Sequence, residues 1–257
     1  MLAAVLAAVF IGGHLGSESA FPGRGWQSRR ESAKASGRPR DRSRCGLAGA
    51  YHRLGVLSST APAGVAVACV VASYLAGTFP TAALVGRWRG VDPTRSGSGN
   101  PGATNVLRTA GRRAGAVTLV GDLAKGAVAV GGGWVVGGHG LGVACGLAAV
   151  SGHVLPVTRG FRGGKGVATA AGMAVVLFPL AAAVAGAVFA VVVGVSRTVS
   201  LASVAAAATL PVVVAAMGAP GPEVAALAAG AALIVWAHRQ NVVRLVHGDE
   251  PRLGARS

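Results

Sequence analysis

Long apolar runs separated by short polar stretches fill the chain from residue 61 onward. The runs cover about 62–85, 114–136, 141–157, 166–195, 200–217 and 223–236, and Ala, Val, Leu and Gly dominate them. A hydrocarbon core needs roughly 20 helical residues to cross, and only helices or closed barrels satisfy their backbone hydrogen bonds inside it. The pattern therefore predicts an all-α, polytopic membrane protein.

The run at 166–195 fits either one long helix or two short ones, because Phe178 and Pro179 interrupt it near its middle. Basic residues favour the cytoplasmic side of a membrane. A single crossing would place Arg197 and the basic C-terminal tail outside, whereas two crossings place every basic loop inside. We therefore expect seven transmembrane helices, some of them short, with the N-terminal side outside and the C-terminus in the cytoplasm.

Residues 1–60 differ in composition from the rest of the chain. They hold nine Lys or Arg and three Asp or Glu, and 21–53 is rich in Arg, Ser, Gly and Pro without apolar periodicity. Such a segment is typical of disorder. We expect residues 1–60 to be a dispensable, disordered basic extension, for which an upstream choice of start would account, and residues 61–257 to form the membrane domain.

Composition narrows the function classes further. Only 12% of the residues are charged, against about 25% in soluble domains. The three cysteines form no C-x-x-C pair, so neither a zinc site nor a disulfide framework is predicted. The formal net charge of +16 favours anionic lipid and phosphate as partners, and we expect no nucleic acid, metal or cofactor.

Three polar stretches fall on the predicted cytoplasmic face, at 96–108, 152–169 and 238–250. Glycines let backbone N–H groups approach an anion, and Lys165 adds a full charge to the second stretch. The spacing is not that of a nucleotide-binding P-loop, because only three residues separate Gly160 from Gly164 and Gly166 follows the lysine. A phosphate-sized anion is the better interpretation, although anchoring to lipid headgroups would also explain basic loops.

Asp122 and Lys125 lie three residues apart inside a predicted span, hence on one helix face. They are able to form a structural ion pair, but charges within a membrane segment usually serve function. We therefore favour a functional role for both residues.

The ordered motifs resemble the bacterial integral-membrane acyl-phosphate:glycerol-3-phosphate acyltransferase family, from about residue 74 to residue 250. The motifs are Y-L-A-G-T-F-P at 74–80, G-S-G-N-P-G-A-T-N-V-L-R at 97–108, D-L-A-K-G at 122–126, G-H-V-L-P at 152–156, G-G-K-G-V-A-T at 163–169, R-T-V-S-L at 197–201 and H-R-Q-N at 238–241. The resemblance implies seven transmembrane helices in the bacterial inner membrane and an active site at the cytoplasmic face.

The reaction implied by the resemblance moves the acyl group of acyl phosphate to the 1-hydroxyl of sn-glycerol 3-phosphate. Lysophosphatidic acid and phosphate are the products, in phospholipid biosynthesis. The family also implies a partner enzyme that makes acyl phosphate from acyl carrier protein.

The resemblance also implies roles for individual residues, while it leaves the general base open. Catalytic roles fall to Ser98, Arg108, Lys165, His238 and Asn241. Substrate-binding roles fall to Asn100, Thr104, Asn105, His153, Gly163, Gly164, Gly166 and Ser200.

A membrane transporter of a phosphorylated small molecule is the alternative, because transporters also use short helices and glycine-rich anion sites. Such a protein usually has similar motifs in two halves, and the sequence contains no internal repeat of that kind.

Overall fold

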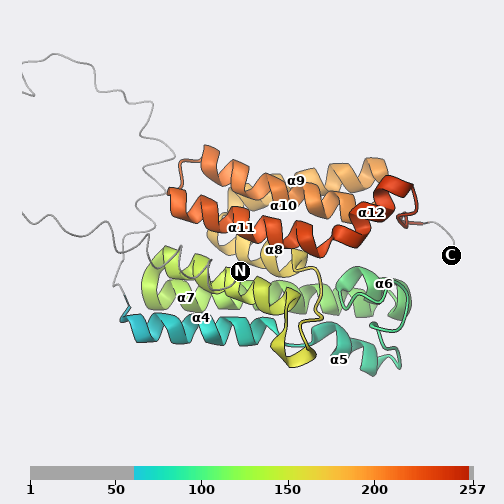
Figure 1. Cartoon of the computed structure of the whole chain (residues 1–257), viewed down its shortest axis with the longest axis horizontal. Helices are drawn as coiled ribbons and strands as arrows, with labels where there is room; N and C mark the ends of the chain where they lie inside the picture. Colours follow the sequence, from blue (N-terminus) through green and yellow to red (C-terminus); the bar gives the residue numbers. More distant parts are fainter. Residues whose placement is uncertain (1–60, 255–257) are drawn as a thin grey trace, which may run out of the picture.

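The computed structural model describes residues 61–254, and within this range it contains helices and no strand. The prediction of an all-α protein is therefore confirmed, while the predicted disordered extension at 1–60 lies outside the described residues. The elements are α4 (Ala63–Gly77), α5 (Thr81–Trp88), α6 (Ala103–Ala110), α7 (Arg112–Val154), the 3₁₀ turn η2 (Val157–Arg159), α8 (Val167–Leu177), α9 (Pro179–Ser196), α10 (Val199–Ala216), α11 (Gly221–Ala237) and α12 (Arg239–His247). Figure 1 shows them as a bundle with their long axes roughly side by side.

Helix α7 is a hairpin of two arms. Gly137 (φ −144°, ψ 21°) and Gly138 (φ 78°, ψ −172°) leave helical geometry in its middle, and the second of these conformations favours glycine. The two arms pack against each other along their length. A Cβ added to Gly146 on the second arm would meet Val130 on the first, and one added to Gly133 would meet Cys145. The apolar runs 114–136 and 141–157 therefore form the two arms.

Glycines allow the helices to approach closely. A Cβ on Gly77 of α4 would meet the backbone of Ala149 in α7, and a Cβ on Gly126 of α7 would meet the carbonyl oxygen of Thr169 in α8. Helices pack in membranes through such small residues, because apolar side chains gain little from leaving lipid. The 41 glycines of the chain thus include positions that interhelical packing requires.

The chain reverses between α8 and α9. Phe178 (φ −137°, ψ 59°) ends α8, and Pro179 takes the first position of α9, where its missing N–H breaks no bond. Lys165, just before α8, and Ser200, just after α9, line the same cavity. The two ends of this helix pair therefore lie at one end of the bundle.

Within residues 61–254, four helical stretches are able by length and composition to cross a membrane, or five if the pair α11–α12, bent by 56°, counts as one span. Helix α7 counts once among them although it folds into two arms. Helix α8 has 11 residues and rises only about 16 Å. The protein is thus a multi-pass helical membrane protein.

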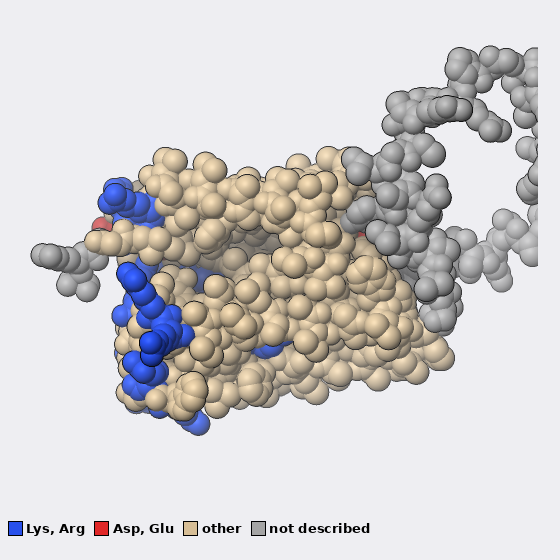
Figure 2. All heavy atoms as spheres, turned by 180° about the vertical axis from the view of Figure 1, so that it is seen from behind, with Lys and Arg blue, Asp and Glu red and all other residues tan. Residues whose placement is uncertain are grey.

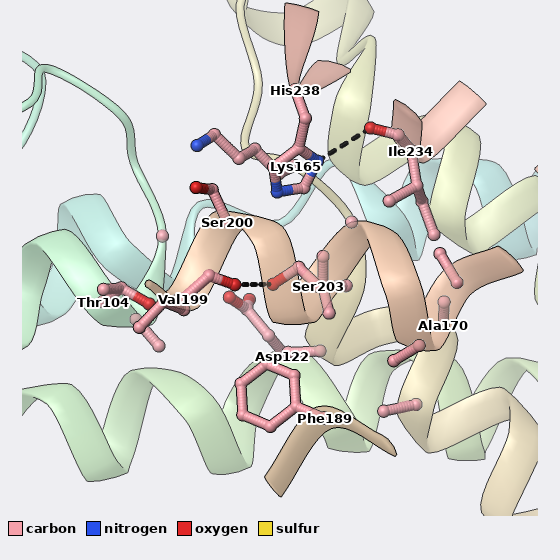
Figure 3. A pocket seen from close by; sticks show the side chains of 18 of the residues that line it. Thr104, Asp122, Lys165, Ala170, Phe189, Val199, Ser200, Ser203, Ile234 and His238 are labelled. Atoms are coloured by element: carbon pink, nitrogen blue, oxygen red, sulfur yellow. Dashed lines mark hydrogen bonds between the residues drawn. The ribbon is translucent and has the colours of Figure 1, made fainter. Parts of the chain in front are cut away.

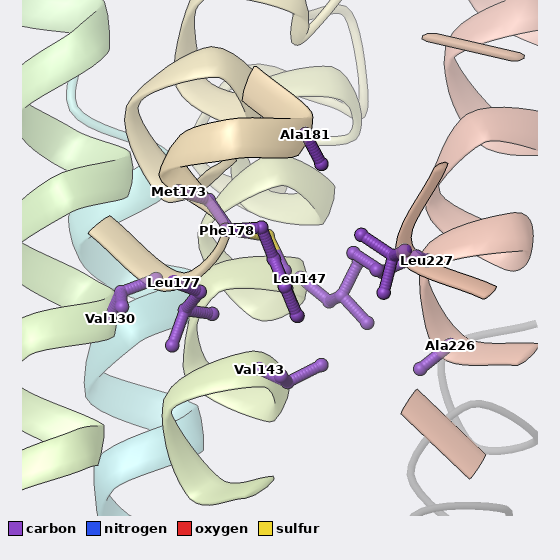
Figure 4. Close-up of a cluster of buried hydrophobic side chains, with 10 residues drawn as sticks. Val130, Val143, Leu147, Met173, Leu177, Phe178, Ala181, Ala226 and Leu227 are labelled. Atoms are coloured by element: carbon purple, nitrogen blue, oxygen red, sulfur yellow. The ribbon is translucent and has the colours of Figure 1, made fainter. Parts of the chain in front are cut away.

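Figure 2 shows basic side chains gathered at one end of the bundle, while most of the long side in view is uncharged. The α5–α6 connection and the tail beyond α11 lie toward one end of the bundle in Figure 1, and they contain Arg89, Arg95, Arg239 and Arg252. The apolar core lies deeper, between α7, α8 and α11, where Leu147, Met173, Phe178 and Leu227 pack together (Figure 4).

Candidate active site

A cavity of about 630 Å³ extends from the basic end into the bundle. Its polar lining residues are Ser98, Asn100, Thr104, Asn105, Arg108, Asp122, His153, Lys165, Ser200, Ser203, His238, Asn241, Arg244 and Glu250. Its apolar lining residues include Leu147, Val150, Met173, Val175, Phe189, Leu210, Leu227 and Ile234. One space therefore joins a charged part to a long apolar part.

Asn105 holds the loop of the first polar stretch. Its Oδ1 accepts the backbone N–H of Ser98 at 2.9 Å, and its Nδ2 donates to the carbonyls of Pro93 at 2.8 Å and Ser96 at 3.0 Å. The side chain is only 2% exposed. The side-chain amide of Asn105 is therefore fully used in hydrogen bonds to the loop backbone, and these bonds hold Ser98 at the cavity.

Arg108 projects from the last turn of α6 at the cavity and is exposed. It forms no ion pair or hydrogen bond with any residue in 61–254. A planar guanidinium with its donors unused is suited to hold a phosphate or carboxylate in two-point fashion.

Lys165 belongs to a chain of polar contacts that joins the α7–α8 connection to the tail. Its Nζ donates to Oδ1 of Asn241, whose Nδ2 donates to Oε1 of Glu250 at 2.6 Å. Nε of Arg244 donates to the other carboxylate oxygen of Glu250 at 2.9 Å. These contacts bring Lys165 and Arg244, which are far apart in the sequence, to the same cavity.

Burial lowers the pKa of Lys165 to about 8; the carboxylate of Glu250 opposes this, while Arg244 and Arg108 add to it. Burial alone would raise the pKa of Glu250, but hydrogen bonds from Asn241 and Arg244 outweigh that effect and lower it. The positive charges are thus incompletely neutralised within the site, and an anion in the cavity would stabilise them.

Ser200 and His238 face the cavity from α10 and from the junction of α11 and α12 (Figure 3). Oγ of Ser200 is buried and lies near enough to Glu250 to lower the pKa of that carboxyl, but its geometry does not complete a hydrogen bond. Nδ1 of His238 lies 2.8 Å from the carbonyl oxygen of Ile234. A carbonyl only accepts, so Nδ1 carries the proton and Nε2 of the neutral ring keeps a lone pair.

The glycines of the second stretch divide into two groups. Gly166 (φ 79°) is the N-cap of α8 and lines the cavity. Gly163 and Gly164 do not line it; they pack against His153, and the N–H of Gly164 donates to the His153 carbonyl at 3.1 Å. The binding role predicted for Gly163 and Gly164 stays a prediction.

The Asp122–Lys125 pair is present, with 2.8 Å between Nζ and Oδ1. Asp122 lines the cavity, whereas Lys125 lies beyond it and also approaches Nδ1 of His153 at 3.2 Å. The pair therefore connects the first arm of α7 with the histidine on its second arm.

All the residues predicted for the site, except Gly163 and Gly164, are brought together in this one cavity. Asp122, Arg244 and Glu250 also line the cavity, although the sequence motifs imply no specific role for them. The sequence feature that marks these three residues as candidates is a charged side chain within or next to an apolar run. The apolar lining carried no such signal, because its residue types occur throughout the chain.

Comparison with known proteins identifies the family. The chain matches the family model described as Glycerol-3-phosphate acyltransferase over residues 67–248. A glycerol-3-phosphate acyltransferase of Myxococcus xanthus is 48% identical over 193 residues, covering 72% of this chain and 98% of that protein. One of Thioalkalivibrio sulfidiphilus is 45% identical over 197 residues, covering 74% and 95%.

The fold is also similar to crystal structures of PlsY (YgiH), described as an integral membrane glycerol 3-phosphate acyltransferase. Its glycerol 3-phosphate form aligns with a TM-score of 0.71 and its lysophosphatidic acid form with 0.69. In both cases the identity is 34%, and the alignment covers 74% of this chain and 96% of the other. The family resemblance indicated by the motifs is confirmed.

Proposed function

Because the chain belongs to the glycerol-3-phosphate acyltransferase family and is an acyltransferase, we propose that it moves the acyl group of acyl phosphate to the 1-hydroxyl of sn-glycerol 3-phosphate. Lysophosphatidic acid and inorganic phosphate are the products, and the step belongs to phospholipid biosynthesis. The observation that carries the proposal is the single cavity, which joins cationic groups to an apolar interior. Membership of an acyltransferase family removes the support for a transporter.

The charged part of the cavity suits two phosphates. Arg108 offers a guanidinium that no residue in 61–254 pairs with, and Lys165 offers an ammonium whose charge an anion would stabilise. Gly166, Val167 and Ala168 line the cavity at the start of α8, where the first N–H groups of a helix have no partner inside it. Donors that reach the cavity from α6, from α8 and from the loop before it allow both substrates to be held at once.

The apolar part suits the acyl chain. Phe189, Leu210 and Leu227 line it from α9, α10 and α11. The neighbouring PlsY structures include a lysophosphatidic acid form, and a molecule of that type needs a phosphate site continuous with an apolar groove. This continuity supports a lipid product on this chain.

Direct transfer accounts for the chemistry without a covalent enzyme intermediate. The glycerol hydroxyl oxygen forms the new ester bond at the acyl carbon, the carbon–oxygen bond to phosphate breaks, and phosphate leaves. The lone pair on Nε2 of His238 is placed to receive or share the hydroxyl proton. Holding both substrates in one cavity supplies the orientation that such a step requires.

The site lies at the cytoplasmic face of the bacterial inner membrane in this proposal, and the chain crosses seven times. The hairpin in α7, the reversal between α8 and α9, and the gathering of basic residues at one end support it. A cysteine in place of Gly140 should react with a membrane-impermeant maleimide on intact cells, whereas one in place of Arg95 should react only after permeabilisation. Labelling of the Arg95 position from outside would refute this orientation.

The activity test uses the full chain in a membrane mimic with palmitoyl phosphate and glycerol 3-phosphate. We expect equal amounts of phosphate and lysophosphatidic acid, strongly reduced by Lys165→Ala. Thr118→Val is the matched control, because its hydroxyl bonds within its own helix to Ala114 at 2.9 Å, away from the cavity. Turnover with acyl-CoA or acyl carrier protein but not with acyl phosphate would refute the proposed donor.

A further inference from the structure

Two histidines line the cavity, and their Nδ1 atoms have partners of opposite kind. Nδ1 of His238 lies 2.8 Å from the Ile234 carbonyl oxygen, which only accepts. Nδ1 of His153 lies 3.2 Å from Nζ of Lys125, which as an ammonium only donates. In the neutral rings the proton is therefore on Nδ1 of His238 but on Nε2 of His153.

The surroundings of Lys125 keep it an ammonium. Its Nζ lies 2.8 Å from a carboxylate oxygen of Asp122, 3.0 Å from the carbonyl of Phe79 and 3.2 Å from Nδ1 of His153. The carboxylate compensates the charge of a lysine that is only 9% exposed. The ammonium thus donates to a carbonyl from the connection between α4 and α5 and to the imidazole on the second arm of α7, and it forms an ion pair with the carboxylate on the first arm.

The hydroxyl of Thr169 lies 3.3 Å from the same Nδ1 and is itself buried. A hydroxyl both donates and accepts, so it does not choose between the tautomers. Oδ1 of Asp122 also faces this Nδ1, but at 3.7 Å it is beyond hydrogen-bond distance. Lys125 at 3.2 Å therefore decides, because an N–H on Nδ1 would point at an ammonium group that has no lone pair to accept it.

His153 is also tied to the loop that carries Lys165. Its carbonyl accepts the N–H of Gly164 at 3.1 Å, and Gly164 lies so close to Nε2 of the ring that a Cβ there would meet it. No residue within 61–254 forms a hydrogen bond with Nε2, while His153 lines the cavity. That N–H is thus available to a substrate.

We propose that Lys125 is a positioning residue that fixes His153 as a hydrogen-bond donor through its Nε2. His238 has the contrary role, because its contact with Ile234 fixes its Nε2 as an acceptor. His153 then holds an oxygen of glycerol 3-phosphate, while His238 accepts from the hydroxyl that attacks. The identity of the substrate rests on the proposed function, whereas the tautomers rest on the contacts alone. Two groups of one residue type thus take complementary roles because their neighbours differ.

Nitrogen NMR of the full chain, labelled with ¹⁵N-histidine, tests the tautomers directly. Resonances missing from His153→Gln and from His238→Gln identify the two rings. We expect His153 to be protonated at Nε2 and His238 at Nδ1, and Lys125→Met to shift His153 toward a mixture of tautomers. Protonation of wild-type His153 at Nδ1 would overturn the proposal, whether or not Lys125→Met folds.

A kinetic cycle tests whether Lys125 acts through His153. We expect Lys125→Met to raise KM for glycerol 3-phosphate roughly tenfold or more, with a smaller change in kcat, as loss of an outer partner typically does. Lys125→Arg keeps a donor-only cation and should restore most of the affinity. In a His153→Gln background, whose amide donates without help, Lys125→Met should have little further effect.

Equal effects of Lys125→Met in both backgrounds would refute coupling through His153, and Thr118→Val again controls for loss of a buried polar group from the same helix. Failure of acyl phosphate as donor would refute the proposed function and leave the NMR result standing. A wrong His153 tautomer in an enzyme that uses acyl phosphate would refute only the role of Lys125.

Discussion

Raising the pH through about 8 should deprotonate the ammonium group of Lys165 and thereby remove most of kcat/KM. Burial lowers the pKa of this lysine to about 8, against the opposing effect of Glu250. The ammonium is the form that binds phosphate, so kcat/KM should be level below that pH and fall above it. Each further pH unit should lower kcat/KM about tenfold until the activity of the neutral amine is reached.

The depth of the fall follows from the interaction that is lost. A hydrogen bond to a charged group contributes about 1.5–3 kcal/mol. At about 1.4 kcal/mol per factor of ten, this predicts a loss of roughly 10- to 150-fold in kcat/KM. Lys165→Met, which lacks the amine altogether, should lie at or below that lower level at every pH.

The assay measures initial rates from pH 6.5 to 10, with enzyme-free blanks that correct for hydrolysis of acyl phosphate. Lys165→Arg provides the reference, because a guanidinium keeps its charge throughout this range. Whatever its level, the activity of this variant should not fall near pH 8. The midpoint for kcat should be higher than that for kcat/KM, because bound phosphate stabilises the ammonium. Parallel profiles for the wild type and Lys165→Arg would refute the reasoning.

Two further predictions concern stability. Asn105→Ala removes three side-chain hydrogen bonds of about 1 kcal/mol each, so both the thermal midpoint and the activity should fall. Asn100→Ala loses no such bond within 61–254 and should leave the midpoint unchanged. Equal midpoints for the two variants would contradict the role of Asn105. Gly126→Ala places a Cβ against the backbone of Thr169, whereas Gly132→Ala meets open space in the same arm, so thermal unfolding in detergent should show a large loss for the first and none for the second. A stable Gly126→Ala protein would show that α7 and α8 separate easily.

Much of this architecture was predictable because a membrane restricts what a chain is able to do. Apolar runs long enough to cross must be helical, and basic residues between them mark one side. These rules placed a break at Phe178 without knowledge of any contact, and α8 and α9 are separated there. Chemically distinctive motifs in the polar stretches then indicated the family, and this is confirmed.

The arrangement inside the site was not predictable in the same way. The sequence led us to treat Gly163, Gly164 and Gly166 as one phosphate-binding group, but only Gly166 lines the cavity. The other two have His153 beside them, a neighbour contributed by the second arm of α7. Periodicity and spacing within a segment contain no information about which residue of another segment lies against it.

Local chemistry along the chain was thus sufficient for the helical class, the membrane setting, the family and the set of polar side chains that face one end. Packing between distant segments was needed for what those side chains do. Lys125 meets the carbonyl of Phe79 across 46 positions, and Lys165 meets Asn241 across 76. Which ring nitrogen of His153 bears a proton, and how far the charge of Lys165 is desolvated, depend on such contacts. Both properties arise when the helices pack and water is excluded, and no single segment contains them.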